Sequence, residues 1–354
     1  MTSSRRLWWA LGVMFVISFG VLGWIGGDIY RQAPPMPERV MVDGGGVLYA
    51  RADIERGRQV WQTTGGQQLG SIWGHGAYVA PDWSADWLHR EATTLLDLWA
   101  QAEYQRPFGQ LSAERQAALQ VRLQAEMRRN TYDPATGAIT VTADRARAIE
   151  QVAVHYETLF GDDPAQRSLR EQYAIAEGAV ADPANRRLLP AFFFWTAWAA
   201  TTERPGSSIT YTSNWPHEPL VGNTPTTSTG MWSIASVILL LAAVGAMVWG
   251  HASARAAEPL AMPARDPLAG LLITPSMRAT AKYFYTVVAL FLVQMTLGAI
   301  TAHYAVEGQA FYGYDLSAIL PYAVVRTWHT QLGIFWIATA WLATGLYMAP
   351  AVSG

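Results

Sequence analysis

The chain contains no cysteine in its 354 residues. This absence excludes disulfides, Cys-ligated zinc, iron–sulfur clusters and c-type haem attached through C-x-x-C-H. Any metal centre must therefore use His, carboxylate, Met or Tyr ligands. Charge is also sparse. Lys282 is the only lysine among 25 basic residues, and the net charge of −2 gives no sign of a nucleic-acid surface.

The sequence is instead rich in apolar segments. Hydrophobic residues make up 51% of it, and the length is sufficient for two structural units. Four nearly uncharged runs each have roughly the 20 residues that a helix needs to cross a bilayer core of about 30 Å. They are residues 7–25, 231–249, 283–302 and 327–349, with the last helix beginning near residue 323. The first is interpreted as an uncleaved anchor and not a signal peptide, because residues 26–30 offer no small-x-small cleavage site.

Basic residues near the ends of these runs predict their orientation. Cytoplasmic segments are enriched in arginine and lysine. Such residues precede the first run and fill the loop between the second and third: Arg5, Arg6, Arg255, Arg265, Arg278 and Lys282. Both termini are thus expected in the cytoplasm of a bacterial inner-membrane protein. Residues 30–229 are expected to form a periplasmic domain between an anchor at 1–29 and a membrane domain at 230–354.

The outer domain is predicted to be mostly helical. Apolar residues at helical spacing indicate helices over residues 83–104, with Ser84 as cap, 111–129 and 142–160. The turn at 132–137 and the alternation after it favour a small hairpin. The very apolar stretch 188–200 is too short to span a bilayer and is interpreted as a buried or interfacial helix.

Four histidines of this domain, His75, His89, His155 and His217, have no partner at metal-ligand spacing. Each is interpreted as a surface histidine or a satisfied core histidine. The fold class is therefore mainly α: four transmembrane helices and a mostly helical outer domain.

His329 lies inside the fourth apolar run, where an ionisable side chain is costly and is a candidate for function. On a helix it shares a face with Gly333, Trp336 and Ala340. The small residues on this face leave room for a flat macrocycle. Imidazole is a common axial ligand of haem iron. The alternative is a histidine that is hydrogen-bonded to a neighbouring helix, and the spacing alone does not decide between them.

His303 and Glu307 follow the third run and lie one helical turn apart, near Tyr304, Phe311, Tyr312 and Tyr314. Oxidation of a quinol releases two protons, which a histidine and a carboxylate at the membrane surface are suited to accept. The alternative is an ordinary aromatic belt with interfacial polar residues.

Several long motifs resemble the quinol-dependent nitric oxide reductases of the haem-copper oxidase superfamily. They are QVWQ with GGQQ (residues 59–68), SIWGHGAYVAPDWSADWLHRE (71–91), FFFWTAWAA (192–200), NWPHEP (214–219), TAHYAVEGQAFYG (301–313) and RTWHTQLGIFWIATAWLATGLY (326–347). The resemblance implies a cytochrome-c-like outer domain that lacks haem c, fused to helices of the catalytic membrane domain.

Carried over to this sequence, the resemblance implies that His329 is an axial ligand of low-spin haem b. It also implies that His303 and Glu307 form the quinol site. The implied activity is oxidation of quinol and reduction of nitric oxide to nitrous oxide. The implied partners are quinol, nitric oxide, the lipid bilayer and the further membrane helices of the family, and whether the chain forms a homodimer stays open.

Family members continue with further membrane helices, which carry the second haem b ligand, the haem b3 ligand and the ligands of a non-haem iron. This chain ends at Gly354. It is therefore expected to be an N-terminal portion that lacks the binuclear centre, with no catalytic residue of its own and inactive alone. Polar faces around Gln294 and Gln331 are expected to meet lipid. Two other hypotheses stay open: a non-enzymatic sensor or assembly module, and a haem held jointly by His303 and His329.

Overall fold

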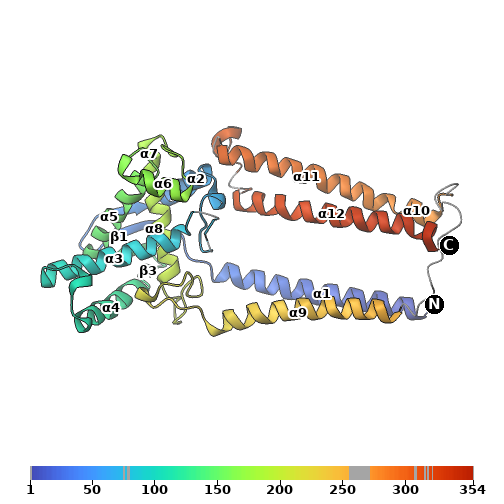
Figure 1. The fold of residues 1–354 in the computed structure, drawn as a ribbon, viewed down its shortest axis with the longest axis horizontal. Helices are drawn as coiled ribbons and strands as arrows, with labels where there is room; N and C mark the ends of the chain where they lie inside the picture. The colour runs from blue at the N-terminus through green and yellow to red at the C-terminus, as the bar shows by residue number, and fades with distance from the viewer. Residues whose placement is uncertain are drawn as a thin grey trace. The chain divides into compact units, whose positions relative to one another are not determined.

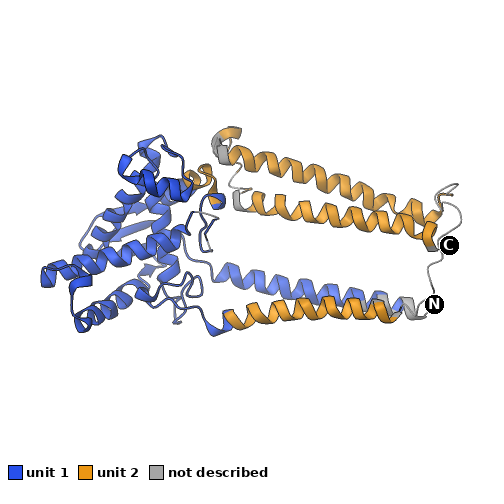
Figure 2. Ribbon diagram, viewed as in Figure 1, with its two compact units in different colours: residues 1–58, 67–229 blue, residues 59–66, 230–354 orange. Residues whose placement is uncertain are grey.

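The computed structural model describes residues 2–74, 76–77, 80–254, 272–306, 309–314, 316, 319–320 and 322–353. Within them the chain is mostly helical, with one small sheet (Figure 1). It divides into two compact units, coloured separately in Figure 2. Unit 1 comprises residues 1–58 and 67–229, and unit 2 comprises residues 59–66 and 230–354.

Four helices in the described part of the chain are long and apolar enough to cross a membrane. They are α1 (Thr2–Arg31), α9 (Thr227–Ala254), α11 (Ala281–Val306) and α12 (Tyr322–Ser353). Each contains one of the four predicted runs, so the prediction of four spans is confirmed. The helices extend beyond the runs because backbone hydrogen bonding continues into the flanking polar residues, where an apolar pattern no longer marks the helix.

The three predicted helices of the outer domain are present. They are α3 (Trp83–Tyr104), α4 (Ala113–Arg128) and α5 (Ala143–Leu159). The predicted cap of α3 is wrong. Asp82, not Ser84, is the N-cap, and its carboxylate accepts from the backbone N–H of Ala85 at 3.0 Å. An ionised carboxylate at this position also complements the positive end of the helix dipole.

A four-stranded sheet with the order β2–β1–β4–β3 lies in unit 1. Its strands are β1 (Arg39–Val42), β2 (Val47–Ala50), β3 (Tyr132–Asp133) and β4 (Ala138–Val141). The predicted hairpin after residue 132 is the antiparallel pair β3–β4. Strand β1 pairs with β2 antiparallel and with β4 parallel.

Helix α8 (Leu189–Thr201) is the core helix of unit 1 and is buried along nearly its whole length. It contacts both α3 and α5. The ring of Phe193 stacks on Trp83 with centroids 5.7 Å apart, and Trp87 stacks on Tyr156 at 5.2 Å. The apolar stretch 188–200 is thus a buried helix, one of the two predicted environments. Burial on every side also explains why its sequence shows no polar face.

The remaining elements are short, apart from α2. The helices are α2 (Arg51–Thr63), α6 (Arg167–Tyr173), α7 (Pro183–Arg186) and α10 (Pro275–Ala279). The 3-10 turns are Gly66–Gln68, Phe108–Gln110, Pro164–Gln166, Pro219–Val221 and Gln309–Tyr312.

Candidate functional site

The helices α11 and α12 pack against each other as a hairpin, and His329 lies at their contact. Its Nδ1 is 2.9 Å from the backbone oxygen of Gln294 on α11. A carbonyl oxygen only accepts, so Nδ1 is the donor, and the tautomer of a neutral imidazole that fits this bond has its lone pair on Nε2. The ring packs on Gly298, where an added Cβ would lie 2.7 Å from Cε1 of the imidazole. The glycine is therefore required for this position of the ring.

The side chain of Gln294 joins the same contact. Its Oε1 accepts from the indole N–H of Trp336 at 2.9 Å, and a Cβ at Gly333 would lie 3.4 Å from its Nε2. Gly333 and Trp336 are two of the residues predicted to share a face with His329. The expectation that the polar face around Gln294 would meet lipid is wrong, because α12 supplies the partner.

These contacts are compatible with both interpretations of His329. The side chain is hydrogen-bonded to a neighbouring helix, as one alternative proposed. That bond uses only Nδ1. A histidine that ligates a metal commonly donates its other ring N–H to a carbonyl or carboxylate, which fixes the tautomer and the ring orientation. The hydrogen bond from Nδ1 of His329 to a backbone oxygen thus fits a histidine that ligates haem iron through Nε2.

His303, near the end of α11, lies in an aromatic cluster. Its ring stacks on Phe311 with centroids 4.0 Å apart, and Tyr312 meets it edge-on at 5.9 Å. The hydroxyl of Tyr304 donates to the backbone oxygen of Leu320 at 3.1 Å inside the hairpin. The structure therefore brings together His303, Phe311 and Tyr312, the central part of the predicted quinol site.

Two other members of that predicted site are not in the cluster's described contacts. Glu307 lies outside the described residues. Tyr314 is described and is 63% exposed.

The two histidines lie at different levels of the hairpin. His329 contacts Gln294, and His303 is nine residues further along α11. At about 1.5 Å per residue, this separates the two levels by roughly 14 Å. In this structure the His329 ring is hydrogen-bonded to Gln294 and the His303 ring stacks on Phe311, so these contacts give no support to a haem held jointly by both histidines.

In unit 1, three of the long sequence motifs meet in one network. The indole N–H of Trp73 donates to the backbone oxygen of Thr196 on α8 at 2.7 Å. The indole N–H of Trp215 donates to the backbone oxygen of Gly74 at 3.0 Å. Asp82 also accepts from the backbone N–H of Gly74, at 2.7 Å. These contacts join the three segments, and those at Gly74 satisfy a backbone N–H and a backbone oxygen that lie outside any helix or strand.

The described histidines of the outer domain either contact other residues of the domain or face solvent. His89 pairs with Glu218 at 2.8 Å, and His217 is exposed. Burial, assisted by the nearby positive charge of Arg90, lowers the pKa of His155 to about 4, so this side chain is neutral at physiological pH. His75 lies outside the described residues. Among the residues that are described, no three His, Cys, Asp or Glu side chains gather to hold a metal ion.

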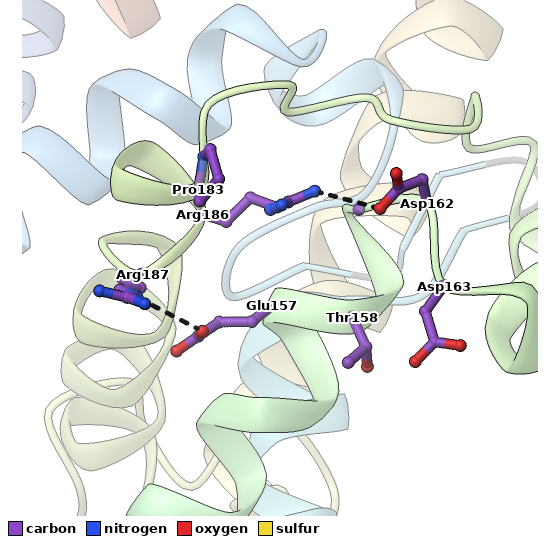
Figure 3. Close-up of a pocket in the computed structure, with 8 residues that line it drawn as sticks. Glu157, Thr158, Asp162, Asp163, Pro183, Arg186 and Arg187 are labelled. Atoms are coloured by element: carbon purple, nitrogen blue, oxygen red, sulfur yellow. Dashed lines mark ion pairs between the residues drawn. The ribbon is translucent and has the colours of Figure 1, made fainter.

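A cavity of about 250 Å³ opens between the end of α5 and α7 (Figure 3). Its charges are already paired: Arg186 with Asp162 at 3.7 Å and Arg187 with Glu157 at 3.9 Å. The carboxylate of Asp163 accepts from a backbone N–H as the cap of the next turn. The charged residues that line this cavity therefore pair with one another, and the cavity is not a candidate ligand site.

The hairpin geometry alone does not define the class of protein, but comparison with known families does, and it gives a membrane oxidoreductase related to the haem-copper oxidases. Residues 278–354 match the family described as cytochrome c and quinol oxidase polypeptide I, the haem-copper oxidases. Residues 37–217, just over half of the chain, match the NorB cytochrome c-like domain of nitric oxide reductase. The chain belongs to the NorB family of nitric oxide reductases. No curated protein matches it.

Proposed function

We propose that this chain oxidises quinol at the end of the α11–α12 hairpin and passes the electrons to a haem b bound by His329. The observation that carries the proposal is the His329 contact. Its Nδ1 donates a hydrogen bond to the backbone oxygen of Gln294, which leaves Nε2 as the nitrogen that can ligate iron. When bound, haem b would accept and pass on one electron at a time. The reduction of nitric oxide is the reaction of the family that the sequence resembles.

At the quinol site, the residues of this chain have two tasks. A quinol loses two protons and two electrons on oxidation, so the site needs proton acceptors. The imidazole of His303 takes one proton, and Glu307 is proposed to take the other. Phe311 and Tyr312 provide flat apolar surfaces beside His303, which suit a quinol ring.

The experiment that tests the quinol site compares two electron donors. In a complete enzyme that carries this chain, His303→Ala should lower quinol-driven turnover by about 10²-fold or more, the usual contribution of general acid–base catalysis. Turnover with an artificial donor that reduces the haem directly should be largely kept. Glu307→Gln should give the same split.

Tyr285 on α11, which is 76% exposed and outside the predicted quinol site, provides the control: Tyr285→Phe should leave both rates unchanged. Equal loss with both donors in His303→Ala would show that His303 serves folding and not quinol oxidation.

The proposed topology places both termini in the cytoplasm and the large domain in the periplasm. This rests on the arginine and lysine residues around the spans, since such charges are retained in the cytoplasm. A reporter that is active only outside the cytoplasm should be active when fused after Gly161. The same reporter should be inactive after Arg265, in the loop outside the described residues. The opposite pattern of activity would reverse the assignment.

A further inference from the structure

A cavity of about 560 Å³ lies in unit 1 where α1 ends. Its lining includes Asp28 and Ile29 from the end of α1 and Gln32 just after it, together with Trp73, Arg204 and Tyr211 from the folded domain. This size falls within the range of about 300–1,000 Å³ that is usual for small-molecule sites. Neither the proposed haem site nor the proposed quinol site uses any of these residues.

Arg204 brings a positive charge to the cavity with only neutral partners. Its Nη1 donates to the side-chain oxygen of Gln32, and its Nη2 donates to the backbone oxygen of Tyr211 at 2.9 Å. Its Nε is buried and has no hydrogen-bond partner. No ion pair forms between Arg204 and a carboxylate of the described residues. A partly buried guanidinium without a counter-ion is costly, and an anion in the cavity would supply the counter-ion.

Asp28 adds a negative charge to the lining of the cavity. The carboxylate of Asp28 accepts from the side-chain nitrogen of Gln32 at 2.5 Å, so Gln32 connects the two charged groups. Asp28 lies in the last turns of α1, and the carbonyl end of a helix carries a partial negative charge. The cavity therefore presents a cationic group and an anionic group to one ligand.

The position of the cavity relates it to lipid. The apolar span of α1 is Leu11–Arg31, so Asp28 and Gln32 lie at the level where that span leaves the hydrocarbon. The side chains of Ile25 and Ile29 are 42% and 65% exposed on this helix. Trp73 and Tyr211 add the amphipathic rings that are typical of the membrane–water interface.

We propose that this cavity binds the headgroup of an amine-bearing phospholipid, of the phosphatidylethanolamine type. The phosphate accepts from Arg204, the ammonium group donates to Asp28, and the acyl chains follow the exposed apolar side of α1. The bound lipid thereby connects the anchor to the folded domain.

Lipid binding to the purified, delipidated chain in detergent tests the proposal by native mass spectrometry. The probes are dioleoyl phosphatidylethanolamine, dioleoyl phosphatidylglycerol and inorganic phosphate. The first bound lipid should be phosphatidylethanolamine in preference to phosphatidylglycerol. Arg204→Gln should weaken binding of both lipids by about tenfold, the effect of one charge-assisted hydrogen bond. Asp28→Asn should remove only the preference for phosphatidylethanolamine.

Arg31→Gln is the matched control, because it removes a positive charge from the same helix end without changing the cavity lining. It should leave binding unchanged. Equal loss in Arg204→Gln and Arg31→Gln would overturn the proposal, and so would an unchanged lipid preference in the conservative Asp28→Asn. Arg204-dependent binding of inorganic phosphate that displaces the lipid would also overturn it, by defining a site for a soluble anion.

Discussion

Replacing His329 by alanine should abolish the low-spin haem b absorbance of a complete enzyme that carries this chain. The imidazole is held by the 2.9 Å hydrogen bond to the backbone oxygen of Gln294, which fixes the ring for the proposed ligation through Nε2. Alanine offers no atom that can replace it. The measurement is the reduced-minus-oxidised spectrum of the purified protein, together with its haem content. A normal low-spin signal in this variant would rule out ligation by His329.

Gly298 provides a graded version of the same test. An added methyl group would lie 2.7 Å from the imidazole Cε1, so Gly298→Ala must displace the ring. We expect a shifted haem spectrum and lower haem retention. Gly345→Ala on α12 is the control, since nothing lies within 4 Å of its added Cβ. A wild-type spectrum in both glycine variants would show that ring packing on Gly298 does not orient the ligand.

A stable, colourless wild-type chain would favour the sensor or assembly hypothesis.

Removing Arg145 should strongly destabilise the outer domain. Its Nε donates to a carboxylate oxygen of Glu91 at 2.7 Å, and the side chains are only 3% and 0% exposed. The second oxygen of Glu91 accepts from the indole N–H of Trp87 at 2.8 Å. Arg145→Met leaves a buried carboxylate without its counter-ion, which costs about 3–5 kcal/mol. The unfolding midpoint, followed by circular dichroism at a fixed heating rate, should fall on the order of 10 °C.

Two further variants separate charge from volume. Arg147→Met changes an arginine on the same helix that is 64% exposed and pairs with Asp144, so it should cost about 1 kcal/mol or less. Glu91→Gln combined with Arg145→Met removes both charges and keeps an acceptor for Trp87. It should regain much of the stability lost in Arg145→Met. Equal shifts in Arg145→Met and Arg147→Met would show that the buried pair does not stabilise the domain.

The longer helices of the outer domain were predictable because their information is local. Helix α3 spans Trp83–Tyr104, the same residues that the sequence predicts, and α5 lies within the predicted 142–160, whereas α2 was not predicted. The parallel pairing of β1 with β4 was not predictable. Val40 lies opposite Ile139, and nothing in either short strand specifies a partner about 100 residues away.

The candidate site divides in the same way. His329 is found from the sequence because an ionisable residue within an apolar span is unusual. Its partner is not, since a backbone carbonyl carries no residue identity and only the register of α11 against α12 selects Gln294. The network of Trp73, Thr196 and Trp215 was likewise hidden, because its members are far apart in the chain.

The late position of α8 in the chain determines when the outer domain acquires its core during synthesis. Trp83 stacks on Phe193, which is made more than 100 residues later. At about 5–20 residues per second, the face of Trp83 that Phe193 covers therefore stays exposed for roughly 5–20 s on every nascent chain. Over that interval the nascent chain exposes an apolar, aggregation-prone surface, because helix α8 has not yet been synthesised. Its yield in a cell should thus depend on holding chaperones more than on the stability of the finished fold.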